Sequence, residues 1–227
     1  QSTASDDGKL TGIEDYVDRM ATDQKEILFL YGKNRKSIES GPYLEALQAR
    51  GYEVLLLTEP VDEYVMQSLR EFKEKKIISA DSDELKLEKL DEQPSGESLD
   101  KKAVNKLSKW IKESLKDRVS EVETGERLIN SPVCVVGEDG MGGASARRIM
   151  KMMQGPEDEV PASKVKFQIN PRHSIIHGLN KLMEKDEPTA ILVANQLLDN
   201  ALASANLLDD PREMIQRSYQ TLEKITA

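Results

Sequence analysis

The sequence has one cysteine and no long apolar run, and each of these shortages excludes particular structural features. A single cysteine, Cys134, allows neither an internal disulfide nor a thiolate metal cluster, and its apolar surroundings predict a small buried residue in a strand. No apolar stretch approaches the roughly 18 residues of a membrane span, and no signal-peptide pattern is present. Asp and Glu number 41 against 32 Lys and Arg, which disfavours nucleic acid and anionic membranes as main partners.

The 227 residues are enough for two modest domains. We expect a small α/β domain with three α-β-α layers, followed by an α+β domain that ends in a helical bundle. A polar stretch with Pro and Gly between two helical patterns predicts the linker. The expected parts are a flexible lead-in at 1–10, the α/β domain at 11–90, the linker at 91–98 and the α+β domain at 99–227.

The first domain should contain a βαβ unit. Two short apolar runs, 27–31 and 54–57, are too short for helices, and a helical pattern between them ends at Gly51, a C-cap residue. The two strands should therefore be parallel. A capping pattern at Thr11 predicts an earlier helix, Pro60 opens another, and a third strand is expected at 76–80.

The second domain should begin with a long helix carrying Leu107, Ile111 and Leu115 in register. Three strand-like runs and three helices should follow it. Each of these helices has Pro near its first turn, where the missing N–H costs nothing. The expected strands are 119–128, 133–136 and 165–169, and the expected helices are 171–185, 188–207 and 211–225.

Two segments could carry chemistry. The turn Gly137–Gly143 enters a helix with Arg147 and Arg148, and a glycine-rich turn of this kind can cradle phosphate, but it lacks the G-K-[ST] ending of a P-loop. His173 and His177 are four residues apart, yet no third ligand supports a metal, and a local hydrogen bond is favoured. We expect no catalytic residues and no metal site. A nucleotide- or phosphate-dependent α/β enzyme that uses the glycine turn stays as the alternative function.

The helix after the glycine turn is dense in methionine. Its apolar positions lie three or four apart, as in an ordinary helix packed on a core. Methionine is also over-used on surfaces that adapt to many partners, so protein binding is a second interpretation. The stripe consists of Ala146, Ile149, Met150 and Met153, with Met141 and Met152 outside it.

The last two helices have wide apolar stripes at the end of the sequence. Small residues on the first helix allow close helix approach, and pairing with a second copy in a four-helix bundle would cover both stripes. The alternative is packing on their own domain. The predicted dimer contacts are Ile191, Ala194, Leu198, Ala201, Ala205, Met214, Ser218, Leu222 and Ile225.

Several strings, in order along nearly the whole chain, resemble the heat-shock protein 90 family of chaperones. They occur in the same order as in that family, and together they are far more specific than any single string. The strings are 13–20 (IEDYVDRM), 51–57 (GYEVLLL) with 60–64 (PVDEY), 127–132 (RLINSP), 148–151 (RIMK), 169–173 (INPRH) and 209–211 (DDP).

The resemblance implies the end of the middle domain plus the C-terminal dimerisation domain of a bacterial-type member. It implies a homodimer that binds non-native client proteins, in the cytoplasm or an organellar matrix. ATP and Mg²⁺ would bind in an N-terminal domain outside this sequence, so we expect no cofactor and no ATPase activity here, but an ATPase in the parent protein. The implied client contacts are Glu63, Tyr64, Gln67, Met141, Ile149, Met150 and Met153.

Overall fold

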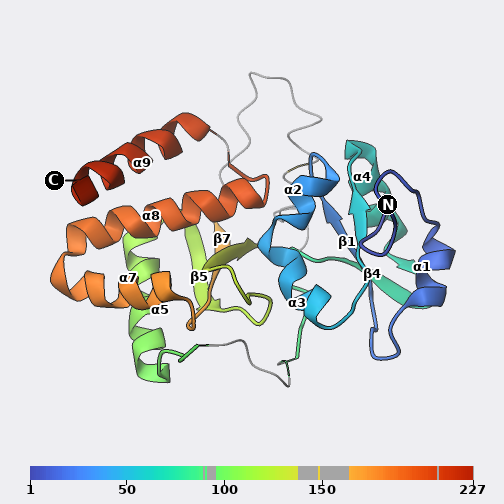
Figure 1. Ribbon diagram of the computed structural model, residues 1–227, viewed down its shortest axis with the longest axis horizontal. Helices are drawn as coiled ribbons and strands as arrows, with labels where there is room; N and C mark the ends of the chain where they lie inside the picture. The colour runs from blue at the N-terminus through green and yellow to red at the C-terminus, as the bar shows by residue number, and fades with distance from the viewer. Residues whose placement is uncertain (89, 91–95, 138–147, 149–163, 209, 227) are drawn as a thin grey trace. The chain divides into compact units, whose positions relative to one another are not determined.

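The computed structural model divides the chain into two compact units, each described here by itself (Figure 1). Unit 1 contains residues 1–90 with Gly137 and Arg148, and unit 2 contains the described residues of 96–136 and 164–226. The structure describes residues 1–88, 90, 96–137, 148, 164–208 and 210–226. The predicted linker at 91–98 lies mostly outside these ranges.

Unit 1 is a mixed α/β unit in which short helices alternate with strands of one sheet. The alternation follows the sequence pattern, in which short apolar runs are separated by helical repeats and closed by turn residues. Its elements are α1 (Ile13–Arg19), β1 (Ile27–Tyr31), α2 (Arg35–Glu39), η1 (Pro42–Leu44), α3 (Glu45–Ala49), β2 (Leu55–Leu57), α4 (Pro60–Leu69), β3 (Glu71–Phe72) and β4 (Lys75–Ser79).

The sheet of unit 1 has the strand order β2-β1-β4-β3. The central strand β1 pairs in parallel with both β2 and β4. The helix before β2 ends as predicted: Gly51 has φ +71°, and the Tyr52 N–H donates to Leu47 O at 3.0 Å.

The edge strand β3 was not predicted from the sequence. It forms an antiparallel hairpin with β4 through Lys73 and Glu74, both of which have positive φ. Such two-residue turns are usually recognised by Asn or Gly. Because Lys73 and Glu74 stand at this turn, no turn signal in the sequence indicated the hairpin.

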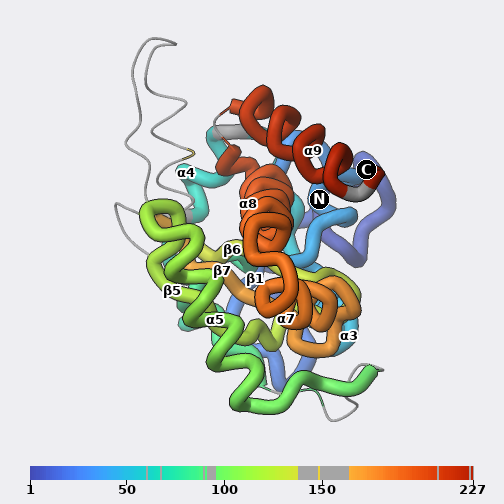
Figure 2. The backbone as a smooth tube through the Cα atoms, turned by 90° about the vertical axis from the view of Figure 1, so that its left-hand side faces the viewer, coloured from blue at the N-terminus to red at the C-terminus, as the bar shows by residue number. Residues whose placement is uncertain are grey.

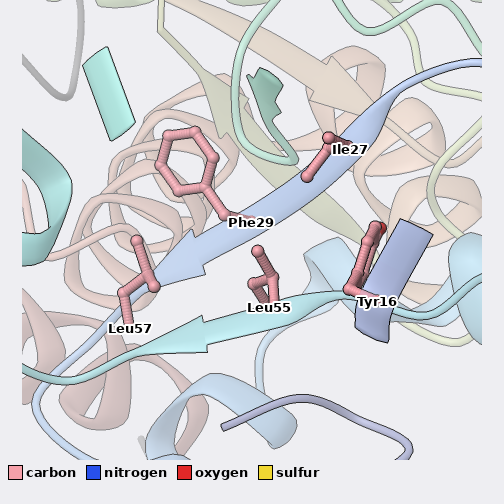
Figure 3. Packing of buried hydrophobic residues seen from close by; sticks show 5 residues of the cluster. All are labelled: Tyr16, Ile27, Phe29, Leu55 and Leu57. Atoms are coloured by element: carbon pink, nitrogen blue, oxygen red, sulfur yellow. The ribbon is translucent and has the colours of Figure 1, made fainter. Parts of the chain in front are cut away.

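One face of this sheet is packed with the side chains shown in Figure 3. Ile27 and Phe29 from β1 meet Leu55 and Leu57 from β2, and Tyr16 from α1 closes the cluster. All of the side chains from 27 to 30 are buried, so β1 is covered on both of its faces, as is typical of parallel strands.

Tyr16 also satisfies polar groups inside this core. Its hydroxyl donates to Glu53 O at 2.7 Å and accepts from the Leu28 N–H at 3.0 Å and from Gln24 Nε2 at 2.7 Å. Burial is the main cause that raises the pKa of Tyr16 to about 12. The phenol is therefore held neutral, with every hydrogen-bonding position used.

The first residues differ from the flexible lead-in that the sequence indicated. Ser2 is buried and forms an antiparallel bridge with Leu55, while the Leu56 N–H donates to Gln1 O at 2.9 Å and the Thr3 N–H donates to Val54 O at 2.9 Å. The physical reason is that the outer edge of β2 would otherwise leave backbone groups unpaired.

Helix α1 begins one residue later than its capping pattern predicted. Gly12 is the N-cap, and its N–H donates to the Asp15 carboxylate at 3.3 Å. The Thr11 hydroxyl instead accepts a hydrogen bond from Arg19 Nη2 at 2.8 Å.

Unit 2 combines a three-stranded sheet with helices. The sheet has the order β5-β7-β6, with β7 parallel to β5 and antiparallel to β6. Its elements are α5 (Lys101–Leu115), β5 (Val119–Thr124), β6 (Val133–Val136), β7 (Val165–Ile169), α7 (Ser174–Lys185), α8 (Glu187–Ser204) and α9 (Pro211–Thr226).

Helix α8 is central to unit 2. It contacts α5, α7, β6 and α9, and α8 and α9 lie side by side in both views (Figures 1 and 2).

Cys134 is buried in β6, as its apolar surroundings predicted. Asn206, at φ +56°, follows the C-cap of α8, and the Leu207 N–H donates to Leu202 O at 2.9 Å. None of the described helices has both the length and the apolar character that crossing a membrane requires.

We predict that alkaline pH destabilises unit 1 through Tyr16. Below pH 10 the phenol is protonated in both the folded and the unfolded state, so its full contribution to the free energy of unfolding is present. Between pH 10 and about 12 only the unfolded state ionises, and the free energy of unfolding falls by up to about 3 kcal/mol. Urea denaturation followed by circular dichroism should show this fall in the native sequence. The variant Tyr16→Phe should be less stable at neutral pH and should lack this part of the slope; an unchanged slope would contradict the assignment.

Candidate binding surfaces on helices α4 and α9

Helix α4 exposes a row of large apolar side chains. Val61, Tyr64, Val65 and Leu69 lie on one face of the helix, and Tyr64 is 58% exposed. Neighbouring apolar residues on the surface of a soluble unit mark an interaction site more often than isolated ones do. We call these four residues the outer face of α4.

The opposite side of α4 is held to unit 1 by packing and by charge. Met66 packs against the core cluster of β1 and β2, and Glu63 is completely buried. The Glu63 carboxylate accepts from Arg148, with Nη2 to Oε1 at 2.6 Å and Nε to Oε1 at 3.0 Å. With Glu63 buried and Met66 packed on the core, the outer face of α4 is turned toward solvent.

Arg148 is also paired with a second buried carboxylate. Its Nη1 lies 2.9 Å from Asp81 Oδ2, and its guanidinium carbon lies 6.0 Å from the centre of the Tyr31 ring. Tyr31 ends β1 and Asp81 follows β4, so the ion cluster of Glu63, Asp81 and Arg148 lies at the carboxyl ends of the parallel strands. In open α/β sheets this edge is where ligands bind. Here a side chain of the same chain occupies it.

The balance of charge in this cluster favours the ionised forms. Burial alone would lower the pKa of Arg148, but the charges of Asp81 and Glu63 and their hydrogen bonds outweigh burial and raise it above the ordinary arginine value. A buried guanidinium with two carboxylate partners is far less costly than one without them.

This geometry changes two sequence predictions. Glu63 was expected to contact client proteins, but it is 0% exposed and acts inside the unit by holding Arg148. Arg148 was one of the two basic residues of the alternative phosphate site, but it is already neutralised by buried carboxylates. The sequence could not show this, because Glu63 and Arg148 are 85 positions apart.

The other predicted client contacts have different outcomes. Tyr64 lies on the outer face of α4, as a contact residue should. Gln67 is on the same helix, but its side chain is outside the described residues. The same holds for the methionine helix and for most of the glycine turn: Arg147, Met141, Ile149, Met150 and Met153 lie outside the described residues.

Helix α9 differs from the other long helices in what it buries. Among its residues with described side chains, none is fully buried. Ile215, Tyr219 and Leu222 are exposed at spacings of four and three, with Tyr219 62% exposed, and we call them the outer row of α9. The half-buried residues form an inner row consisting of Met214, Arg217, Ser218 and Thr221.

Most of the predicted contacts on α8 are part of the core of unit 2. Ala194, Leu198, Ala201 and Ala205 are buried within a single chain, which corrects their assignment to a dimer surface. The physical reason is that α8 lies between α5, α7, β6 and α9, so its small-residue stripe is used for close packing inside the unit. Ile191 is half-buried.

On α9 the predicted contacts include some of the exposed residues and stay a prediction. Leu222 is exposed, Met214 and Ser218 are half-buried, and the side chain of Ile225 is outside the described residues. Ile215 and Tyr219 were missed. The signal that could have found them is their i, i+4, i+7 spacing with Leu222.

The remaining polar candidates make local contacts. His173 caps α7, where its Nδ1 accepts from the Ile175 N–H at 3.1 Å, and His177 Nε2 lies 2.9 Å from Pro171 O. Within the ranges that the structure describes, no group of three or more His, Cys, Asp or Glu residues is placed to hold a metal.

Comparison with known proteins decides the family. A sequence model described as Hsp90 protein matches residues 1–226. The chain belongs to the Hsp90 family. Chaperone protein HtpG of Desulfitobacterium hafniense (strain Y51) is 36% identical over 225 residues, which cover 99% of this chain and 36% of that protein. Heat shock protein 75 kDa, mitochondrial, of Rattus norvegicus is 36% identical over 232 residues, which cover 99% of this chain and 32% of that protein.

A third Hsp90 relative agrees with these two. Chaperone protein HtpG of Myxococcus xanthus (strain DK1622) is 36% identical over 222 residues, covering 96% of this chain and 34% of that protein. The chain thus spans about a third of the length of these relatives. All three relatives are named as chaperone or heat shock proteins.

Family membership also overturns the expectation that the chain is no enzyme. That expectation rested on the absence of an ATP site from the sequence. The Hsp90 match runs through residues 1–226, and the HtpG and heat shock relatives each align with 99% of the chain. The whole matched length therefore belongs with the Hsp90 family, and the comparisons do not separate this chain from its family as a non-enzyme.

We predict that Arg148→Met strongly destabilises unit 1, because it leaves two buried carboxylates without their cation. The expected loss is about 3–5 kcal/mol. Hydrogen exchange of the β1 amides should report it, while the fluorescence of Trp110, the only tryptophan, reports unit 2 and should show an unchanged unfolding transition.

The matched control is Lys73→Met, which breaks the exposed ion pair with Glu14 at 2.6 Å in the same unit. An exposed pair contributes little, so β1 protection should stay close to that of the native sequence. Equal protection in both variants would show that the buried cluster does not hold unit 1 together.

Proposed function

We propose that this chain is the part of an Hsp90-type chaperone that joins two copies and binds non-native proteins. It would correspond to the end of the middle domain, as a three-layer α/β unit, and the C-terminal dimerisation domain, which completes a helical bundle with its partner. The observation that carries the proposal is the pair of exposed apolar rows, one on α4 and one on α9, in a chain whose charged residues make up 32%.

Self-association is best supported at α9. A helix of 16 residues without a fully buried described side chain gains little from its own unit, and isolated helices of this length are marginal in water. A second copy of the same helix offers an apolar row of the same length. Two α8–α9 pairs related by a twofold axis would bury both outer rows in a four-helix bundle.

Client binding is best supported at the outer face of α4. Its four side chains form a small apolar patch, suited to weak contact with many exposed apolar segments. Tyr64 adds a ring with a polar end, which can contact apolar and peptide groups alike. By the family resemblance, Gln67 and the methionines at 141, 150 and 153, with Ile149, would also contact client proteins.

The whole protein would be an ATP-dependent chaperone with ATP and Mg²⁺ as cofactors. This part of the proposal rests on the family, whose members are about three times the length of this chain. A cytoplasmic or organellar-matrix location is supported by relatives that are bacterial HtpG proteins and a heat shock protein named as mitochondrial.

We expect the native chain to be a dimer at tens of micromolar in sedimentation velocity. The variant Tyr219→Asp with Leu222→Asp places charge in the outer row and should weaken association roughly a hundredfold, about 3 kcal/mol. The control, Gln216→Asp with Gln220→Asp, adds the same charge to exposed polar positions of α9 and should leave the dimer intact. A monomeric native chain would remove the self-association part of the proposal.

We also expect Tyr64→Ser with Val65→Ser to weaken client binding by about fivefold or more, because it removes half of the outer face of α4. The measurement is the fluorescence anisotropy of labelled, reduced and carboxymethylated α-lactalbumin, which cannot refold. The control, Leu10→Ser with Ile175→Ser, removes exposed apolar side chains elsewhere and should bind as the native chain does. If the two double variants bound equally, α4 would not be the client surface.

A further inference from the structure

Asp199 is a charged residue in the interior of unit 2. It lies on α8, is 0% exposed, and is bonded to two guanidinium groups from different elements. Arg217 of α9 donates through Nε to Oδ2 at 2.6 Å and through Nη2 to Oδ1 at 3.1 Å. Arg118, which precedes β5, donates to Oδ1 through Nη2. The carboxylate thus links α8 to both the sheet and α9.

The charges around Asp199 are matched. Arg217 is also 3.3 Å from Glu213, so two arginines face two carboxylates. Arg118 makes a further hydrogen bond to Asn195 Oδ1 at 2.9 Å, which fixes the guanidinium on the α8 side. The hydrogen bond from Arg217 to Asp199 is the main cause that raises the pKa of Arg217. A buried carboxylate that lost one of these partners would become costly.

The apolar contacts of α9 do not fix its orientation. The inner row is only half-buried, and two of its four members, Ser218 and Thr221, are small and polar. A rotation of α9 by one residue, about 100°, would carry the outer row away from its present direction at little apolar cost. The two-atom contact from Arg217 to Asp199 is directional, since both donor atoms must meet both carboxylate oxygens. It therefore defines one rotation of the helix.

We propose that Asp199 and Arg217 are a positioning pair that sets the rotation of α9 on α8 and so presents Ile215, Tyr219 and Leu222 to a second copy of this chain. The inference rests on the proposed self-association and adds the residues that determine its geometry. Arg118, which precedes β5, bonds the same carboxylate as Arg217 does. The orientation of α9 therefore also depends on the position of the start of β5. Neither Asp199 nor Arg217 needs to touch the partner copy.

The test measures dimer dissociation by sedimentation velocity over a range of concentrations of the 227-residue chain. Arg217→Met keeps the length of the side chain but removes both bonds to Asp199, and should weaken association about tenfold or more. Arg217→Lys keeps the charge but not the two-atom contact, so it should restore less than half of this loss. Arg212→Met is the control, because Arg212 is on the same helix, is exposed and forms its ion pair with Asp210 and not with Asp199.

A purely structural role would instead appear in the stability of unit 2. Asp199 keeps Arg118 in Arg217→Met, so unit 2 should lose some stability but stay folded: at the temperature of the dissociation measurement, Trp110 fluorescence and the protection of the β5 and β7 amides should be those of a folded unit. The variant Asp199→Asn serves where Arg217→Met gives too little folded protein, and the combined variant should be no weaker than Asp199→Asn alone if the two residues act together.

Each outcome separates the two proposals. A native dimer that Arg217→Met leaves unchanged, or that Arg217→Lys fully restores, overturns the positioning pair and leaves self-association standing. A native chain that stays monomeric overturns both. A native dimer weakened by Arg217→Met but not by Arg212→Met supports both.

Discussion

In α4 and α9, a buried charge that must be paired ties the helix to its own unit. In unit 1 the charge is Glu63 on the inner side of α4, and its partner is Arg148. In unit 2 it is Asp199, and the partner on the helix is Arg217 of α9. In both cases the loss of one partner leaves an ion in a low-dielectric interior, which is far more costly than the loss of an apolar contact of similar size. Orientation therefore follows from a directional bond and not from the depth of an apolar face.

These buried ion pairs explain why both helices carry apolar side chains on their outer faces. A surface helix usually turns its apolar stripe to the core, and hydrophobic burial then sets its rotation. Where a buried ion pair sets the rotation, the apolar stripe is free to face solvent. The outer face of α4 and the outer row of α9 are the result. Exposed apolar surfaces of this kind mark interaction sites, which another chain covers for at least part of the time.

The same feature limits what the sequence could predict. Strands such as β1, β6 and β7 were found to within a residue, because continuous apolar runs with flanking turn residues depend on local chemistry. The contacts of Glu63 with Arg148 and of Asp199 with Arg118 join positions more than 80 apart, and no local pattern encodes them. The apolar stripe of α8 was visible, but whether a stripe such as Ala194 and Leu198 meets its own unit or a second copy depends on which neighbours α8 already has. The β3–β4 hairpin escaped because Lys73 and Glu74 replace the usual turn residues.

The two ion pairs also make the two proposed activities separable. The cluster of Glu63, Asp81 and Arg148 lies entirely within unit 1, and the cluster of Asp199, Arg118 and Arg217 lies entirely within unit 2. Neither cluster shares a residue with the other, and effects at sites without shared partners are usually additive. A change that releases α9 should therefore leave α4 oriented, and a change at α4 should leave α9 oriented. Any coupling between self-association and client binding would then have to come from the arrangement of whole units and not from these side chains.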